Sequence, residues 1–321
     1  MKPAILLIGT NGQVGRELIK TLPRVGDVTP LDRQRLDLTQ PEDIRHAIRN
    51  FRPALIVNAA SYTAVDKAES EESIARAVNA EAPAVMAEEA KKIGASLIHF
   101  STDYVFDGLK TVPYEEDDPG NPQNVYGRTK LEGEHAIRAS NVTHLIFRTS
   151  GVYATEGRNF LLTILRLATQ HEELRIVRDQ VGAPTLNSVI ARAITDILTQ
   201  FCDSRGGPFS LADVSGIYHM TASGQTSWFD FAKAILEEAA QSTSAGTWFT
   251  SATNGLPLIA RRVIPITTRE YSTPAKRPAF SVLSNVRLNR TFSLQLPTWQ
   301  EQLHSVFAKP SARMTKPEFR S

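Results

Sequence analysis

Apolar runs alternate with amphipathic segments through the first 150 residues of the chain. The runs are apolar at nearly every position, as in strands that are buried on both faces. In the segments between them, apolar residues recur every three or four positions, which is the period of an α-helix. Strands are therefore predicted at residues 3–10, 27–32, 53–60, 95–103 and 143–150, and helices at 12–22, 40–51, 72–94 and 124–140.

The predicted helices have recognisable ends. The second begins with Pro41 and two acidic residues, and the third ends at Gly94, a residue suited to a left-handed cap. Pro83 lies within that third helix and is predicted to kink or break it, because proline lacks the N–H that a helix interior needs. The alternation predicts an α/β fold, a doubly wound parallel (Rossmann) sheet. Ligands of such sheets bind at the carboxyl ends of the strands.

Beyond residue 150 the pattern becomes less regular. Helical period returns at 159–169 and 188–200, short apolar runs predict strands at 174–179 and 216–221, and the Ser-, Thr- and Pro-rich stretch 241–280 is expected to be irregular. We predict a smaller, irregular C-terminal substrate domain whose segments leave and rejoin the main sheet. The Rossmann domain is assigned residues 1–150 and about 181–221, the second region about 151–180 and 222–308, and a flexible tail 309–321.

Composition limits the classes of function. The chain has 321 residues, 41% hydrophobic and 22% charged, which is typical of a globular protein. A net charge of +2 gives no strong attraction to nucleic acid or to a membrane surface, and no run approaches the ~18 apolar residues of a membrane span. Cys202 is the only cysteine, which excludes an internal disulfide and a cysteine-based zinc site. A reducing cytoplasm fits this composition, and no catalytic metal is expected.

Three glycines lie between the first predicted strand and the first predicted helix. Gly9, Gly12 and Gly15 form a G-x-x-G-x-x-G pattern in the stretch "GTNGQVG". Glycines allow a tight turn and a close approach of the backbone to a pyrophosphate, and the helix N-terminus adds free N–H groups and a positive dipole end. The strand–loop–helix setting therefore predicts a dinucleotide site.

The end of the second predicted strand carries acidic and basic residues together. Asp32 lies 20 residues after Gly12, where a carboxylate can bind the ribose hydroxyls on the adenine side, although a solvated turn acid is the alternative. Arg33 and Arg35 follow at once and could instead pair with a 2′-phosphate. The sequence therefore leaves the choice between NADH and NADPH open. Further along, Asp37 could meet the adenine amine and Leu38 could cover the ring.

A phenol and an ammonium lie one helical turn apart, at Tyr126 and Lys130. Alone, this pair would suit an exposed helix with a snorkelling lysine. However, Thr102 follows the fourth strand at the same sheet edge, and a ketone that receives hydride at carbon needs a proton on oxygen. A nearby ammonium would lower the pKa of the phenol from about 10 and make it a better acid near pH 7. Thr102 would position the substrate oxygen.

Longer stretches around these residues carry a family resemblance. The glycine pattern, Thr102, Tyr126 and Lys130 resemble the extended short-chain dehydrogenase/reductases. The chain resembles one subfamily more closely, the dTDP-4-dehydrorhamnose reductases. This resemblance extends over about residues 3–300. It implies reduction of the C4 ketone of dTDP-4-dehydro-L-rhamnose by NADH or NADPH. The matching stretches are "GQVGREL", "NAASYTAVDKAE", "STDYVFDG", "NVYGRTKLEGE", "LIFRTSGVYA" and "DQVGAPT".

The resemblance implies a role for individual residues of this chain. Tyr126, Lys130 and Thr102 are the implied catalytic residues. For Asp103, capping of the following turn is the alternative to contact with the sugar. The implied cofactor-binding residues are Gly9, Gly12, Gln13, Val14, Asp32, Asp37, Leu38, Ala59, Ala60, Ser61, Tyr62 and Thr63, with Tyr126 and Lys130, and the implied substrate-binding residues are Thr102, Asp103, Tyr126, Gly151 and Arg277.

The chain departs from the family pattern at several positions. Gly151 stands where the family usually has a Trp that lines the sugar site, so a flat wall is expected to be missing. Some family members bind magnesium between subunits through several acids. Glu17 remains here, but Ser188 and Gln300 stand at the apparent partner positions, so no metal is expected.

The departures leave alternatives for function open. The first is a reductase or epimerase of another nucleotide-linked 6-deoxy-4-keto sugar, and the second is a non-catalytic NAD(P)-binding regulatory subunit similar to the methionine adenosyltransferase beta subunit. Lys276 and Arg277 could reach the diphosphate of a sugar nucleotide, with solvated basic residues as the alternative. The expected partner is a dTDP-sugar, not nucleic acid or a membrane, and a homodimer is compatible with the resemblance.

Overall fold

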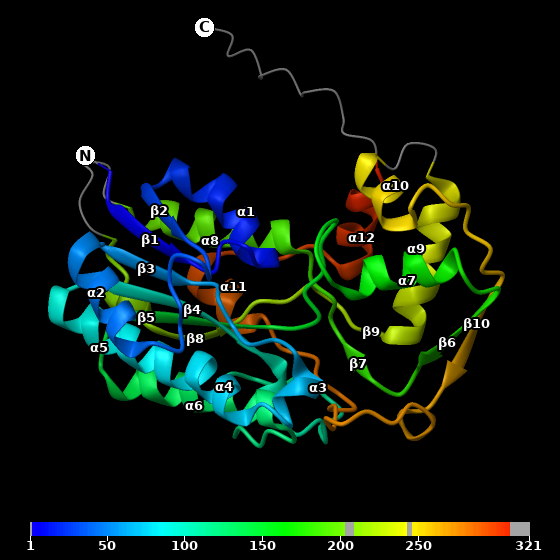
Figure 1. Cartoon of the computed structure of the whole chain (residues 1–321), viewed down its shortest axis with the longest axis horizontal. Helices are drawn as coiled ribbons and strands as arrows, with labels where there is room; N and C mark the ends of the chain where they lie inside the picture. Colours follow the sequence, from blue (N-terminus) through cyan, green and yellow to red (C-terminus); the bar gives the residue numbers. More distant parts are fainter. Residues whose placement is uncertain (1, 203–208, 243–245, 309–321) are drawn as a thin grey trace, which may run out of the picture.

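The computed structural model describes residues 2–202, 209–242 and 246–308. Its centre is a six-stranded sheet in the order β2-β1-β3-β4-β5-β8, and every neighbouring pair is parallel. The predicted doubly wound fold is confirmed (Figure 1). The strands are β1 (Ala4–Ile8), β2 (Asp27–Leu31), β3 (Leu55–Asn58), β4 (Ser96–Thr102), β5 (His144–Thr149) and β8 (Gly216–His219).

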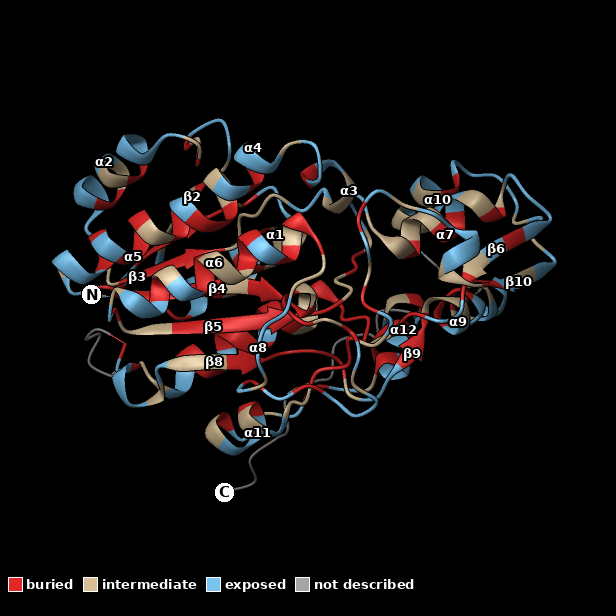
Figure 2. Cartoon of the chain, turned by 90° about the horizontal axis from the view of Figure 1, so that it is seen from below, coloured by how far each residue is buried: buried red, intermediate tan, exposed pale blue. Residues whose placement is uncertain are grey.

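Helices cover both faces of the sheet, and two apolar clusters fill the layers between (Figures 1 and 2). The first cluster joins one face to α1 (Gln13–Thr21), α8 (Asn187–Gln200) and α11 (Val286–Phe292), and the second joins the other face to α2 (Pro41–Phe51), α5 (Ala82–Ile93) and α6 (Val125–Ala139). Strands such as β3 are buried along their whole length, which is why most of their residues are apolar.

The predicted helix over 72–94 is continuous but changes its winding. It consists of α4 (Glu72–Arg76), a π-helical turn η2 (Ala77–Glu81) and α5. The irregularity precedes Pro83, whose missing N–H cannot complete an ordinary turn. At Gly133, a Cβ would lie 2.2 Å from the carbonyl oxygen of Asn79, so only glycine lets α6 pack this closely on η2. Gly94 caps α5 at φ +72°, as predicted.

A second group of elements lies beside the carboxyl ends of the sheet strands, on the right of Figure 1. Its helices surround a third apolar cluster. β6 pairs in parallel with β10, and β7 pairs antiparallel with β9. The elements are α7 (Phe160–Ala168), α9 (Trp228–Gln241), α10 (Thr247–Thr253), α12 (Trp299–Phe307), β6 (Glu173–Val177), β7 (Val181–Gly182), β9 (Thr226–Ser227) and β10 (Arg262–Ile266).

Two predictions about this region were wrong. The stretch 241–280 contains α10 and β10, although it was expected to be irregular. β10 belongs to a two-stranded sheet and leaves most of its residues partly exposed, so it lacks the apolar run of a buried strand. In addition, α11 was placed in the substrate region, but its Leu288 and Phe292 pack in the first cluster of the Rossmann sheet. The other domain boundaries remain predictions.

Short elements complete the described chain. They are η1 (Leu22–Arg24), α3 (Val65–Ala68), η3 (Asp103–Val105), η4 (Ala212–Val214) and η5 (Thr268–Glu270). Within the described ranges, no helix is long and apolar enough to cross a membrane. The predicted tail 309–321 lies outside the described residues.

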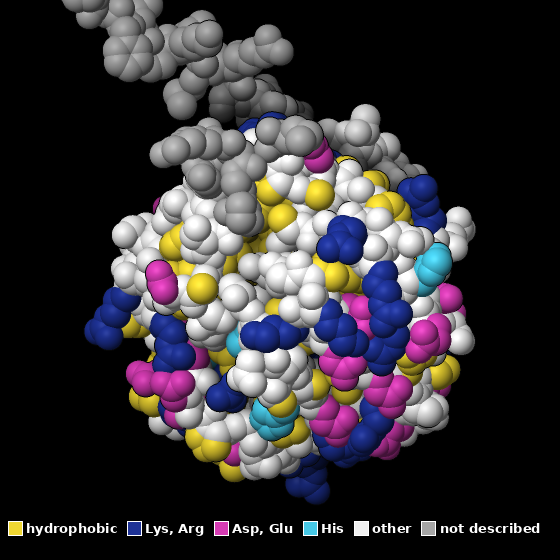
Figure 3. Space-filling view, turned by 90° about the vertical axis from the view of Figure 1, so that its left-hand side faces the viewer, with side chains coloured by type: hydrophobic (Ala, Val, Ile, Leu, Met, Phe, Trp, Pro, Cys, Tyr) yellow, Lys and Arg dark blue, Asp and Glu magenta, His cyan; other side chains and the backbone are white. Residues whose placement is uncertain are grey.

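Opposite charges are interspersed on the face of the molecule that Figure 3 shows. A cluster of ion pairs connects α2 with α5. In it, the buried carboxylate of Glu89 contacts Arg45 and Arg49 of α2 and Lys92 of α5. These contacts, that with Arg49 above all, lower the pKa of Glu89 to about 2. A buried carboxylate is tolerated here because its hydrogen-bond partners are charged.

Candidate active site

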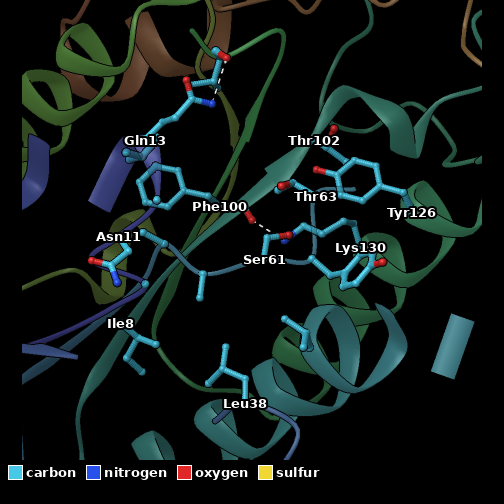
Figure 4. A pocket seen from close by; sticks show the side chains of 18 of the residues that line it. Ile8, Asn11, Gln13, Leu38, Ser61, Thr63, Phe100, Thr102, Tyr126 and Lys130 are labelled. Atoms are coloured by element: carbon cyan, nitrogen blue, oxygen red, sulfur yellow. Dashed lines mark hydrogen bonds between the residues drawn. The ribbon is translucent and has the colours of Figure 1, made fainter. Parts of the chain in front are cut away.

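A cavity of about 890 Å³ opens at the carboxyl ends of β1, β3, β4 and β5 (Figure 4). Thr102, Thr63, Ser61, Tyr126 and Lys130 gather on one side of it, and Gln13 and Asn11 lie opposite. The predicted cofactor and substrate residues that line it are Gly9, Gly12, Gln13, Val14, Asp32, Asp37, Leu38, Ala59, Ala60, Ser61, Tyr62, Thr63, Thr102, Asp103, Tyr126, Lys130 and Gly151.

The glycine loop packs closely against the backbone that follows β3. At Gly9, with φ +87°, a Cβ would lie 2.4 Å from the backbone nitrogen of Ala60, and at Gly15 a Cβ would lie 2.2 Å from the carbonyl oxygen of Gly9. Gln13 Oε1 and Ser101 Oγ are buried in the cavity wall without hydrogen-bond partners among the described residues. Unpartnered polar atoms beside a glycine cradle fit a dinucleotide, which offers hydroxyl, amide and phosphate groups.

The adenine-side residues are held by the local backbone. Asp32 Oδ1 accepts the backbone N–H groups of Gln34 at 3.0 Å and Arg35 at 3.1 Å, while Asn11 donates to Asp32 Oδ2 at 3.3 Å. Asp37 Oδ1 accepts both the backbone N–H and the hydroxyl of Thr39, and the backbone hydrogen bond is the largest cause of its lowered pKa. Both carboxylates are therefore fixed at the cavity edge.

We predict that Arg33 selects the cofactor. Arg33 lines the cavity next to Asp32, whereas Arg35 is turned back and donates to the carbonyl oxygen of Pro30 at 3.3 Å. Because a charged hydrogen bond contributes about 1.5–3 kcal/mol, Arg33→Ala should raise the Kd for NADPH roughly 10–100-fold and leave that for NADH nearly unchanged. Fluorescence titration of both cofactors measures this.

Arg35→Ala is the matched control for this prediction, since it removes the same charge from the same loop. It should leave both Kd values unchanged. Equal effects of the two substitutions on NADPH binding would contradict the assignment of Arg33 to a 2′-phosphate.

Asn79 holds the loop that follows β3, and the sequence analysis missed it. Its side chain, fully buried in η2, accepts from Ser61 Oγ and from the backbone N–H of Tyr62, both at 2.8 Å. It donates to the carbonyl oxygen of Tyr62 at 3.1 Å and to Thr129 Oγ1 of α6 at 3.2 Å. All its hydrogen-bonding capacity thus fixes a cavity loop against α6. An Asn within a helical pattern gives no sequence signal for this.

Tyr126 lies in the first turn of α6, where Asn124 caps the helix by accepting the N–H of Gly127 at 2.8 Å. Its phenol hydrogen-bonds with Thr102 and Ser61. The pKa of Tyr126 is raised to about 12, with burial as the largest cause. The expected lowering of this pKa by Lys130 is therefore not observed, and the phenol holds its proton at pH 7.

Lys130 is directed at the sheet, which explains that difference. Its Nζ donates to the carbonyl oxygen of Phe100 at 2.6 Å and lies 3.0 Å from Nε2 of His99. The lysine is 1% exposed, and burial lowers its pKa to about 7, while Glu134 raises it in part. The amine that was expected to be an ammonium beside the phenol is thus only partly charged at pH 7.

The carboxylate of Asp103 is buried among three hydroxyl groups, those of Thr102, Ser150 and Ser281. Thr102 Oγ1 donates to Asp103 Oδ1 at 3.0 Å, and Ser150 Oγ donates to Oδ2 at 2.8 Å. Burial raises the pKa of Asp103. The following turn is capped by Thr102, which accepts the N–H of Tyr104 at 3.2 Å, so the alternative role of Asp103 as the cap is not observed.

With this geometry described, comparison with known proteins identifies the family. The family model described as "RmlD substrate binding domain" matches residues 1–311. The chain belongs to the RmlD substrate-binding-domain family. A protein of Burkholderia thailandensis named dTDP-4-dehydrorhamnose reductase is 46% identical over 297 residues, covering 92% of this chain and 95% of its own. One of Escherichia coli K12 with the same name is 41% identical over 300 residues, covering 92% and 94%.

A solved structure supports the same family. The dTDP-4-dehydrorhamnose reductase of Bacillus anthracis, crystallised in complex with NADP, matches with a TM-score of 0.83 and 32% identity, over 96% of this chain and 99% of its own. The match extends through both the sheet and the second group of elements.

Gly151 of this RmlD family member has an aromatic neighbour from another element. It adopts φ +54°, and a Cβ there would lie 3.1 Å from Cη2 of Trp228 at the start of α9 and 3.2 Å from Cα of Pro184. All three line a second cavity of about 100 Å³, which shares Gly151 and Asp103 with the main one. Trp228 thus supplies an aromatic surface where Gly151 was expected to leave none.

We predict that Gly151→Ala lowers stability by about 1–3 kcal/mol, because it adds left-handed strain and crowds Trp228 and Pro184. Gly94→Ala is the control for strain alone, since Gly94 has φ +72° and open space around its Cβ. Urea unfolding measures both free energies. A loss no larger at Gly151 than at Gly94 would contradict the crowding.

The C-terminal basic residues lie outside the lining of the main cavity. Arg277 forms a bidentate ion pair with Asp66, with N–O distances of 2.8 and 3.1 Å, and Lys276 donates to Gln123 Oε1 at 3.1 Å. Pro278, the next residue, lines the second cavity. In this RmlD family member, contact of Arg277 with a sugar nucleotide therefore remains a prediction.

Proposed function

We propose that this chain is a dTDP-4-dehydrorhamnose reductase, an oxidoreductase that converts dTDP-4-dehydro-L-rhamnose to dTDP-L-rhamnose with NADPH or NADH. The observation that carries the proposal is a phenol, Tyr126, that lines the same cavity as a glycine cradle suited to a dinucleotide. Relatives with this name share 46% and 41% identity with nearly the whole chain.

The reaction needs a hydride at carbon and a proton at oxygen. A bound nicotinamide supplies the hydride. Tyr126 donates its phenolic proton to the C4 oxygen, and its raised pKa keeps that proton in place at pH 7. Thr102 would donate to the same oxygen by turning its single hydroxyl proton from Asp103, to which it donates in this structure, to the substrate. Lys130, which also lines the cavity, would donate a hydrogen bond to the cofactor ribose.

An NADPH-oxidation assay across several dTDP-4-keto sugars, with the products identified, tests the proposal. Oxidation with dTDP-4-dehydro-L-rhamnose and formation of dTDP-L-rhamnose is the expected result. Preference for a different 4-keto sugar would mean that this sugar, and not dTDP-4-dehydro-L-rhamnose, is the substrate. Cofactor binding without turnover, together with a stoichiometric enzyme partner, would favour the regulatory-subunit alternative.

The remaining expectations concern partners and location. The substrate is a dTDP-sugar in this proposal, and dTDP-rhamnose synthesis for cell-surface polysaccharide places the enzyme in the cytoplasm. A homodimer and the absence of a nucleic-acid partner remain predictions.

A further inference from the structure

His99 joins helix α6 to the end of strand β3 through its imidazole ring. It lies in β4 with 0% exposure, and Nε2 is 3.0 Å from Lys130 Nζ while Nδ1 is 3.1 Å from Nδ2 of Asn58. Asn58 ends β3 and is also 0% exposed. The ring therefore links the lysine of α6 to the loop that begins at the end of β3.

The directions of these hydrogen bonds follow from one backbone group. The N–H of Ala60 can only donate, and it reaches Oδ1 of Asn58 at 3.1 Å. This contact turns Nδ2 of Asn58 toward His99, so Nδ1 of the imidazole must accept. A neutral imidazole then carries its proton on Nε2, which donates to Lys130 Nζ. Only an uncharged amine can accept that bond, because an ammonium has no lone pair.

The surroundings of Lys130 agree with this assignment. Burial lowers the pKa of Lys130 to about 7 and is also the largest cause that holds the pKa of His99 well below its ordinary value. Glu134, which favours the charged lysine, already makes a bidentate ion pair with Arg148 of β5. Glu134 acts on Lys130 from its own helix, His99 of β4 contacts it, and Arg148 of β5 pairs with Glu134. Other titratable groups line the same cavity, among them Tyr62, Glu71, Asp103, Tyr104 and Tyr126.

We propose that His99 is a positioning residue that couples the charge of Lys130 to the backbone N–H of Ala60 in the cofactor cavity. Protonation of Lys130 requires Nε2 to accept, so the imidazole proton moves to Nδ1. Asn58 must then turn its amide oxygen toward His99, which releases the N–H of Ala60. The net change is the uptake of one proton, and no other reactant takes part.

The consequence concerns cofactor binding, and it rests on the proposed function, in which Lys130 contacts the cofactor ribose. In that function Lys130 lines the cavity that holds the anionic cofactor, and a negative charge nearby favours the protonated lysine. Binding should therefore take up a proton and weaken as the pH rises through the pKa of Lys130.

NMR of the protein with ¹⁵N-labelled histidine tests the hydrogen-bond directions without cofactor or substrate. The His99 signals are assigned by their loss in His99→Gln. In the wild type above pH 8, the proton should reside on Nε2. A proton on Nδ1 there would overturn the proposal, whatever the effect of Asn58→Asp.

Asn58→Asp should reverse the directions of the hydrogen bonds between Asn58, His99 and Lys130. A carboxylate accepts from both Ala60 and Nδ1 of His99, so Nε2 becomes the acceptor and Lys130 stays charged. The ring proton should move to Nδ1, and the inflection in the pH dependence of the NADPH Kd should rise by more than about one pH unit. Asn58→Asp in the His99→Gln background controls for the direct field of the new carboxylate.

An equal rise with and without His99 would overturn the coupling. If NMR finds the imidazole proton on Nε2 but the protein binds no NADPH at any pH, the proposed function is contradicted instead. The two failures are therefore distinguishable.

Discussion

Tyr126→Phe is expected to lower kcat roughly 10²–10⁴-fold, because it removes the proton that the substrate oxygen receives. The Kd for NADPH should change little, since the phenol interacts with Thr102 and Ser61 and the ring that lines the cavity is retained. Steady-state kinetics and fluorescence titration of NADPH measure the two quantities. The loss should appear in kcat rather than in KM, because proton donation occurs only in the transition state.

The pH profile provides a second measurement of the same residue. Burial raises the pKa of Tyr126 to about 12, so the phenol remains protonated across the accessible range and should cause no loss of reduction rate up to about pH 10. A fall in rate near pH 7–8 is assigned to Lys130 instead, and it should persist in the residual activity of Tyr126→Phe.

Tyr153→Phe is the matched control. Its hydroxyl is buried within the third apolar cluster and has no hydrogen-bond partner among the described residues, so its removal should leave kcat unchanged. A Tyr126→Phe enzyme that turned over at the wild-type rate would contradict proton donation by Tyr126.

The sheet was predictable because its strands are buried on both faces. β3 and β4 are buried along nearly their whole length, and their apolar stretches, LIV in β3 and LI in β4, are what a periodicity analysis detects. β10 was missed for the opposite reason, since it forms part of a small sheet and leaves both faces partly exposed. α11 was assigned to the wrong region because its contacts with β8 are between residues about 70 positions apart, which no local pattern encodes.

Cofactor residues of the site were predictable because they follow strands whose carboxyl ends meet at one sheet edge. His99 and Asn79 were missed, although a histidine inside the apolar run "SLIHFST" could have been a signal. A polar residue at a buried strand position needs partners, and here those partners are on β3 and α6. Trp228 was missed because its contact with Gly151 depends on how α9 approaches the sheet.

The electrostatics were the least predictable part of the site. Helical spacing placed Tyr126 and Lys130 on one face, and that was correct. It could not show that Nζ of Lys130 is held by the sheet, at Phe100 and His99, instead of by the phenol. The pKa values of both residues are therefore determined mainly by burial, which depends on the whole fold.

Lys130→Met is expected to weaken NADPH binding about 10-fold or more and to lower kcat roughly 10²-fold, because it removes a polar contact to the cofactor ribose. Methionine fills a similar volume, so the loss would come from the amine and not from a cavity. Titration of NADPH and steady-state kinetics measure these effects.

The same substitution should change how stability depends on pH. A pKa of about 7 in the folded state, against 10.5 unfolded, costs the wild type roughly 4 kcal/mol of stability at pH 7. Between these values the unfolded state binds the proton that the folded state lacks. The stability of the wild type therefore contains a term that rises by roughly 1.4 kcal/mol per pH unit from about pH 7 towards 10.5, and Lys130→Met lacks it.

Urea unfolding of both proteins from pH 6 to 9.5 measures this term as the difference between their free energies, which should shift in favour of the wild type as the pH rises. Lys91→Met, at an exposed lysine of α5, is the control and should give a curve parallel to that of the wild type. Parallel curves for Lys130→Met would mean that Lys130 is fully charged in the folded protein, which would contradict both the lowered pKa and the hydrogen-bond directions assigned to His99.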